Sequence, residues 1–256
     1  MFEWTTPTLF VSDLHLGSIS RDEDVLGRLR SFIKRVDREP LKRLVLLGDL
    51  FDFNLGYQST LFRFHLPLYL ALHQLKLEGI EIFVFTGNHD PDPSPILSDE
   101  LGLTVITHPI SIRLYQETVL LEHGDLLEPS LFKRLLCRLV RTQLVRKIAR
   151  VCPPALSWRL THRLHAHGRM NHEDNFIRLE VVHEAIEKKE KVMLETDHHA
   201  WIFGHFHVVT HVEKVFKNKK LDIFSIGDQV ENYSGLIWDQ RGPRLCCFLP
   251  QQSKIT

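Results

Sequence analysis

Five short blocks of this sequence place carboxylates, imidazoles and a carboxamide close to glycines or to one another. In chain order the blocks are Asp13-Leu14-His15, Gly48-Asp49-Leu50-Phe51-Asp52, Gly87-Asn88-His89-Asp90, His123-Gly124-Asp125 and Gly204-His205-Phe206-His207. Glycine permits tight turns and close backbone approach beside such side chains. A single Asp-x-His or His-x-His block is more often structural than a set of ligands. Five blocks in succession predict a metal site.

The types of donor in these blocks indicate both the kind of metal and the kind of reaction. Mixed His, Asp and Asn ligation suits Mn²⁺, Fe²⁺, Co²⁺ or Zn²⁺, whereas calcium and magnesium sites use mostly oxygen. Two adjacent ions about 3.5–4 Å apart clamp a phosphoryl group and produce hydroxide at neutral pH. The candidate ligands are too many for one tetrahedral site and fit two ions that share a carboxylate: Asp13, His15, Asp49, Asn88, His123, His205 and His207.

The blocks follow short apolar runs, which are typical of buried strands. Runs at 8–11, 44–47 and 80–85 precede the first three blocks, and residues 22–37 and 60–78 between them have helical spacing. This alternation predicts an α/β sandwich with parallel strands, whose sites form where strands end. Because residues two apart share a side of an extended strand, Asp13 and His15 are expected to point the same way, as are His205 and His207.

The second half of the chain differs in charge from the first. Residues 129–172 contain ten Lys or Arg and no Asp or Glu, so this segment carries +10 while the remainder carries −10 to give the net charge of zero. Aliphatic residues recur along one predicted helical stripe: Leu131, Leu135, Leu139, Val145, Ile148 and Val151. From 208 to 249, short β-type runs predict a closing antiparallel sheet.

Two interpretations of the basic segment stay open. It is either an amphipathic helix packed on the core with a solvated basic face, or a cap over the site that meets an anionic membrane surface or an acylated substrate. A basic segment can also follow a nucleic-acid backbone. However, aliphatic residues interleave its charges and only Phe132 and Trp158 offer stacking surfaces. The segment therefore favours lipid over nucleic acid, and no obligate protein partner is indicated.

The composition is that of an ordinary globular domain. The chain has 256 residues, 43% apolar and 25% charged, which fits one large domain with an inserted cap. Four cysteines without a paired spacing favour a reducing compartment. The early Glu3 argues against a signal peptide, and no apolar run is long enough to span a bilayer. We therefore expect a cytoplasmic protein.

As a set, the five blocks resemble the calcineurin-like metallophosphoesterase superfamily. The resemblance implies a four-layer αββα sandwich over 1–256, with a helical cap inserted at 126–198. It further implies that Asp49 bridges two ions, that His89 protonates the leaving group or stabilises the transition state, and that Asp90 orients His89. Asp52 and Asp125 would support the ligands. A non-catalytic scaffold on the same fold is the alternative, and activity with added Mn²⁺ separates the two.

Three features resemble a narrower family, the UDP-2,3-diacylglucosamine hydrolases of the lipid A pathway. They are Phe10-Val11-Ser12-Asp13-Leu14-His15-Leu16, Gly48-Asp49-Leu50-Phe51-Asp52-Phe53 and the basic segment between the last two blocks. This resemblance implies two Mn²⁺ ions and a peripheral position on the inner face of the cell membrane. It also implies cleavage of the pyrophosphate at the α-phosphorus, which yields UMP and 2,3-diacylglucosamine 1-phosphate.

One position departs from that narrower family, which has Arg where this sequence has His89; His is the residue of the wider superfamily. The departure leaves open another lipid or nucleotide diphosphate, or a nuclease or phosphodiesterase activity. The residues expected to contact the substrate phosphates are Arg163, Arg169, Asn171 and Asn175.

Overall fold

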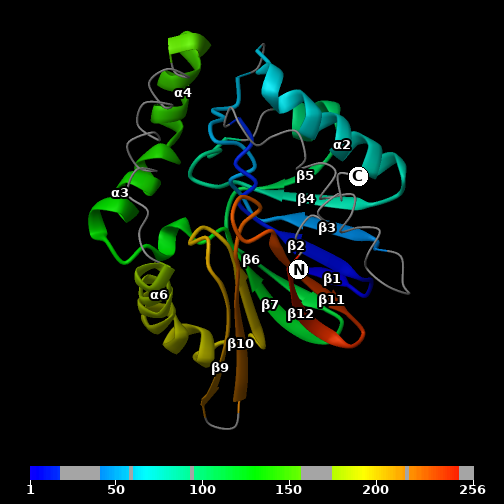
Figure 1. Cartoon of the computed structure of the whole chain (residues 1–256), viewed down its shortest axis with the longest axis vertical. Coiled ribbons are helices and arrows are strands. Elements are labelled where there is room, and N and C mark those ends of the chain that lie inside the picture. The colour runs from blue at the N-terminus through cyan, green and yellow to red at the C-terminus, as the bar shows by residue number, and fades with distance from the viewer. Residues whose placement is uncertain (18–40, 58–59, 93–94, 157–174, 217–218, 248–256) are drawn as a thin grey trace, which may run out of the picture.

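The computed structural model describes residues 1–17, 41–57, 60–92, 95–156, 175–216 and 219–247. The helix predicted at 22–37 lies outside these ranges. Two six-stranded sheets pack face to face (Figure 1). The helix α2 (Leu66–Leu77) lies on one side of the molecule, and α3 (Leu131–Val140), α4 (Gln143–Val151) and α6 (Asn175–Glu195) lie on the other. The predicted α/β sandwich is confirmed.

One sheet carries the first three sequence blocks. Its strand order is β12-β11-β2-β3-β4-β5, and β2 (Thr8–Val11), β3 (Arg43–Leu46), β4 (Glu81–Phe85) and β5 (Thr104–Ile106) run parallel. The strands β2 and β3 are buried at every position, as expected for parallel strands covered on both faces. Their carboxyl ends, and with them the first three blocks, meet at one edge of the sheet.

The other sheet carries the last two blocks. Its order is β1-β6-β7-β8-β10-β9, formed by β1 (Phe2–Trp4), β6 (Ile110–Leu114), β7 (Glu117–Leu121), β8 (Ala200–Phe203), β9 (Val209–Phe216) and β10 (Lys219–Ile226). The strands β7 and β8 are parallel neighbours, so both of their blocks emerge at the same edge. The region after 208 does not form one closing sheet: β9 and β10 pair in this sheet, whereas β11 (Ser234–Asp239) and β12 (Gly242–Cys247) pair in the other.

Three apolar clusters define four layers. One lies between the first sheet and α2 (Leu66–Leu77), and a second fills the space between the sheets. In the third, Val182, Ala185 and Ile186 of α6 (Asn175–Glu195) pack on the second sheet against residues such as Trp201. The helix α6 is therefore the outer layer on that side. Among the described residues of segment 126–198, α3 and α4 project beyond the layers (Figure 1).

The continuous helical stripe expected over 131–151 is broken in the structure. The helix α3 (Leu131–Val140) ends and α4 (Gln143–Val151) begins around Thr142. The Thr142 hydroxyl donates to the Leu139 carbonyl oxygen (2.7 Å) and accepts from the Val145 N–H (3.4 Å). A threonine that caps the following helix in this way favours the break. The stripe is exposed on both helices, with Leu135 at 65% and Ile148 at 59% exposure.

Candidate metal centre

The side chains of the five blocks are aimed by an unusual backbone. Asp13, His15, Asp49, His205 and His207 all have φ between 48° and 69°. Seven non-glycine residues in the described part of the chain have positive φ, and five of these seven are expected ligands. Such conformations cost about 1–3 kcal/mol each and concentrate at functional sites. The expectation that Asp13 and His15, and likewise His205 and His207, follow an extended path was therefore wrong, because left-handed bends beyond β2 and β8 set their directions.

Hydrogen bonds between neighbouring loops hold these bends in place. The Asp13 N–H donates to the Gly48 carbonyl oxygen at 3.1 Å, and the His15 N–H donates to that of Asp49 at 3.0 Å. A Cβ on Gly87 would lie 2.5 Å from the Asp49 backbone nitrogen. The third block approaches Asp49 so closely that only glycine fits at this position.

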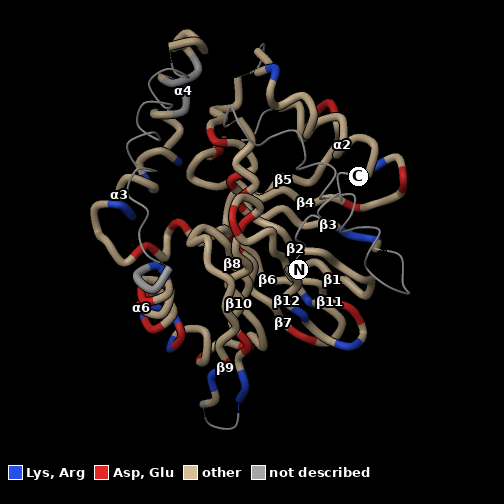
Figure 2. The backbone as a smooth tube through the Cα atoms, viewed as in Figure 1, with Lys and Arg blue, Asp and Glu red and all other residues tan. Residues whose placement is uncertain are grey.

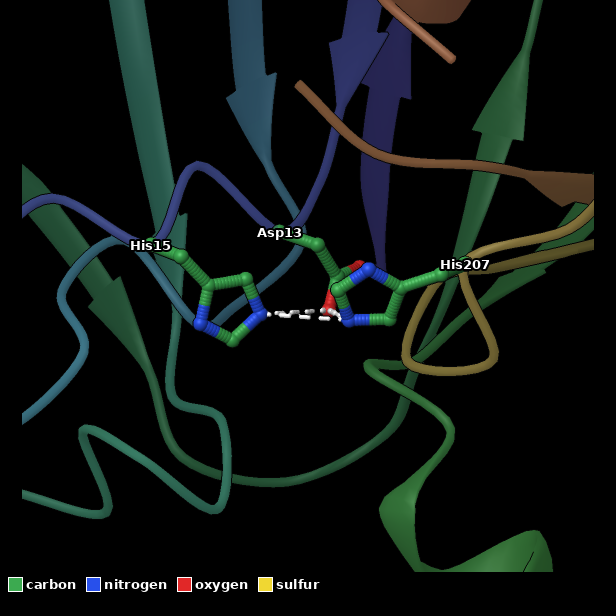
Figure 3. A group of neighbouring side chains, drawn as sticks. All are labelled: Asp13, His15 and His207. Carbon is green, nitrogen blue, oxygen red and sulfur yellow. Dashed lines mark hydrogen bonds and ion pairs between the residues drawn. The ribbon is translucent and has the colours of Figure 1, made fainter. Parts of the chain in front are cut away.

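One donor group consists of Asp13, His15 and His207 (Figure 3). The Nε2 atoms of His15 and His207 lie 3.2 Å apart, and they lie 3.6 and 3.5 Å from Asp13 Oδ1. That oxygen is buried and has no hydrogen-bond partner among the described residues. Two ligands held at about 2.1 Å from one ion lie about 3–3.4 Å apart. The residues present therefore fit a divalent ion at this point.

A second donor group consists of Asp49, His123 and His205. The His123 Nε2 lies 3.3 Å from Asp49 Oδ2 and 3.2 Å from the side-chain oxygen of Asn88. The structure thus brings the amide of the third block to the same point. Asp49 also lies 3.9 Å from the His15 Nε2, so its carboxylate stands between the two groups.

His89 lies beside this carboxylate and joins His15 and Asp49 in a third possible group. Its Nδ1–H donates to the Asp52 carbonyl oxygen at 3.1 Å, which turns Nε2 toward Asp49 Oδ2 at 3.9 Å. The side chain is 23% exposed. His89 is therefore a partly open imidazole beside the Asp49 carboxylate.

Asp90 has a different place from the one expected. Its carboxylate accepts the backbone N–H groups of Gly87 (2.7 Å), Asp49 (3.1 Å) and Leu50 (2.7 Å). The contact that orients His89 is made by the Asp52 carbonyl oxygen instead. Asp90 thus joins the second and third blocks through their backbones. Burial, together with the charge of Asp49, raises the pKa of Asp90 to about 7.

Carboxylates stand behind several of the imidazoles, and sequence reasoning identified only one of them. Asp52 Oδ1, expected in this role, lies 3.4 Å from His15 Nδ1. Asp228 Oδ2 lies 2.9 Å from His207 Nδ1, and Glu128 Oε1 lies 3.2 Å from His205 Nε2. Such partners fix the ring orientation and raise the basicity of a metal-binding imidazole. Neither Asp228 nor Glu128 belongs to a block, so no sequence signal marked them.

The charges of the site reinforce one another. Burial opposes the ionisation of Asp49, but the charges of His123 and His89 hold its pKa well below the usual range. Burial likewise opposes protonation of His123, yet Asp49 raises the pKa of His123 to about 10. Burial lowers the pKa of His89. Without an ion the cluster thus retains protons between carboxylates, and metal binding would release them.

The expected phosphate-binding residues cannot be placed. Arg163, Arg169 and Asn171 lie outside the described residues, and the side chain of Asn175, at the start of α6, does as well. Asp125, expected near the ligands, is buried and paired with Arg141 at 2.7 Å.

Asp and His donors cluster where the strands of this four-layer sandwich end. This arrangement is that of a metal-dependent phosphoesterase. The family profile described as calcineurin-like phosphoesterase matches residues 6–209. The UDP-2,3-diacylglucosamine hydrolase of Porphyromonas gingivalis is 28% identical over 247 residues, which cover 90% of this chain and 93% of that protein. The Pseudomonas aeruginosa protein of the same name is 29% identical, covering 78% of this chain and 81% of its own. The chain belongs to the calcineurin-like phosphoesterases and is a metal-dependent hydrolase.

Proposed function

We propose that this enzyme uses two divalent ions, most simply Mn²⁺, to cleave the pyrophosphate of UDP-2,3-diacylglucosamine into UMP and 2,3-diacylglucosamine 1-phosphate. The observation that carries the dinuclear site is the position of Asp49 between two donor groups. Asp13, His15, Asp49 and His207 would hold one ion. Asp49, Asn88, His123 and His205 would hold the other.

A pair of divalent ions supplies hydroxide at neutral pH and neutralises charge on the phosphoryl oxygens. The residues of this chain determine where that chemistry occurs. Glu128 occupies the Nε2 of His205, which leaves Nδ1 as its ligand atom. His89 donates its Nδ1–H to the Asp52 carbonyl oxygen, so its Nε2 faces the site. Nε2 would donate a proton to the departing phosphate oxygen from the imidazolium form of the ring, which the charge of Asp49 favours against burial.

Support for a lipid-linked nucleotide comes from the relatives and from the projecting helices. Two relatives that cover most of this chain carry the name of that hydrolase. On α3 and α4, the exposed aliphatic residues include Leu131 (75%), Leu135 (65%) and Leu144 (68%). An exposed apolar face of this kind is suited to acyl chains or a membrane surface.

We further propose that α3 and α4 place the enzyme on an anionic membrane surface. Lys133 and Arg138 of α3 are exposed, and Figure 2 shows basic positions along the tube of α3. Among the described residues, no helix combines the length and hydropathy needed to cross a bilayer. The association we propose is peripheral.

The substrate is tested by measuring UMP release from UDP-2,3-diacylglucosamine in the presence of Mn²⁺. Soluble UDP-N-acetylglucosamine, single-stranded DNA and cyclic nucleotides serve as competing candidates. Release of UMP from the diacylated substrate alone supports the proposal. Preference for any of the others rejects the lipid substrate, whatever the metal content.

His89 favours a second candidate, another lipid or nucleotide diphosphate. Its imidazole is smaller than the arginine of the narrower family and has a single donor atom directed into the site, so it would hold a phosphate differently. Comparing wild type with His89→Arg on both UDP-2,3-diacylglucosamine and CDP-diacylglycerol tests this candidate. If His89→Arg cleaves UDP-2,3-diacylglucosamine faster than the wild type does, His89 is not adapted to that substrate. This result would favour the second candidate.

A further inference from the structure

Arg141, at the end of α3, points into the protein, whereas Lys133 and Arg138 of the same helix are exposed. Its side chain is only 19% exposed. The guanidinium donates from Nε and Nη2 to the two oxygens of Asp125, at 2.7 and 2.9 Å. It also donates to the hydroxyl and carbonyl oxygens of Thr86, at 2.9 and 3.0 Å. Four hydrogen bonds therefore hold one side chain.

One partner of Arg141 belongs to a ligand block, and the other directly precedes a different block. Asp125 stands two residues after His123, and Thr86 stands two residues before Asn88. On the inner side of these loops, His123 Nε2 lies 3.2 Å from the Asn88 side-chain oxygen. Arg141 thus bonds to both loops on the side away from the donor atoms, and the side chains of the same two loops meet in the site.

We infer that Arg141 is a positioning residue for the ion site formed by Asp49, Asn88, His123 and His205, and that it couples this site to the projecting helices. The inference rests on the proposed dinuclear function. The helix α3 begins the apolar and basic surface, and its last residue is followed directly by Arg141. A lipid that shifts α3 would therefore act on the spacing of Asn88 and His123.

The geometry requires arginine. The planar guanidinium can donate to both oxygens of Asp125 and to Thr86 at the same time, whereas the ammonium of lysine is a single nitrogen donor. Asp125 is 3% exposed and Thr86 is 3% exposed. Loss of the guanidinium would leave a buried carboxylate without its cation, and the two loops would separate or rearrange.

The test compares Arg141→Gln, Arg141→Lys, Asp125→Asn and the double variant Arg141→Gln/Asp125→Asn with the control Arg113→Gln. Arg113 is 54% exposed and pairs with Glu3 at 3.9 Å on the second sheet, so its loss removes the same charge away from the site. Mn²⁺ binding to the purified full chain is followed by the free-ion electron paramagnetic resonance signal, and melting temperature is recorded alongside.

We expect Arg141→Gln to weaken one of two Mn²⁺ equivalents by about 10-fold or more while the other is retained, the size of effect seen for groups that support metal ligands. Arg141→Lys should recover part of this loss, and Arg141→Gln with Asp125→Asn should be no worse than either change alone. A merely structural role would lower the melting temperature and affect both equivalents alike, or neither.

Equal Mn²⁺ binding by Arg141→Gln and Arg113→Gln would overturn the inference, as would equal weakening of both equivalents. The two proposals can also be separated. If the wild type binds two ions but releases no UMP, and Arg141→Gln selectively loses one ion, this inference is sustained and the proposed substrate is rejected. If Arg141→Gln does not fold, the Arg141→Lys and Asp125→Asn results decide in the same way.

Discussion

Oδ2 of Asp49 lies 3.3 Å from the Nε2 of His123. The same oxygen lies 3.9 Å from Nε2 of His15, in the neighbouring donor group. A single carboxylate therefore faces both groups, and it is 2% exposed. Its neighbours His123 and His15 follow strands of different sheets, β7 and β2, so the site depends on the packing of the two sheets as much as on either one.

Asp49→Asn should lower turnover on an aryl phosphodiester by more than about 100-fold, since changing groups that only support ligands already costs about 10–100-fold. The amide cannot supply the bridging negative charge. Metal content by mass spectrometry should fall at the same time. Asp197→Asn, an exposed change before β8, is the control. An Asp49→Asn variant with full metal content and full rate would reject the bridging role.

His89→Ala should lower turnover while both metal equivalents remain bound. The reason is that Asp13, His15, His207 and the second donor group are complete without this imidazole. Because His89 also lies within the third possible group, metal analysis of the variant decides between chemistry and ligation. Loss of one equivalent would make His89 a ligand.

The sequence predicted the ligand blocks because each directly follows an apolar strand, and parallel strands bring their ends together. It could not predict Asp228 behind His207, or Glu128 beside His205, because single acids in loops have no pattern. Arg141 was one of ten basic residues in its segment, and only the fold separates it from those that face solvent. The left-handed bends at Asp13 and His15 depend on hydrogen bonds that their N–H groups donate to the carbonyl oxygens of Gly48 and Asp49, more than thirty residues away.

Changing Leu135, Leu139 and Ile148 together to serine should reduce binding to anionic liposomes in a flotation assay. These side chains are 65%, 52% and 59% exposed, so the fold should tolerate the change. Raising salt from about 0.1 to 1 M shortens the Debye length from about 10 to 3 Å. Wild type should keep part of its binding, because burial of apolar area persists in salt.

The control for this experiment is on α2, where Leu66, Leu70 and Leu77 are 40%, 60% and 69% exposed. Their change to serine removes similar apolar surface away from the basic helices and should leave flotation unchanged. Wild-type binding that vanishes in salt and ignores the changes at Leu135, Leu139 and Ile148 would reduce the surface to an electrostatic patch.

His65 should make the protein less stable at acid pH. It is 1% exposed, and its Nε2 has no hydrogen-bond partner among the described residues. Burial lowers its pKa from 6.5 to about 3. The folded chain therefore holds His65 neutral, while the unfolded chain binds a proton below pH 6.5. The free energy of unfolding must fall as pH drops from about 6.5 toward 3, by about 2 kcal/mol at pH 5.

Urea unfolding of the wild type at pH 8, 6.5 and 5 should show this decrease in the free energy of unfolding. His65→Phe and His65→Gln should both reduce the decrease by about 2 kcal/mol at pH 5. Parallel curves for wild type and both variants would show that His65 is not the source of the acid sensitivity.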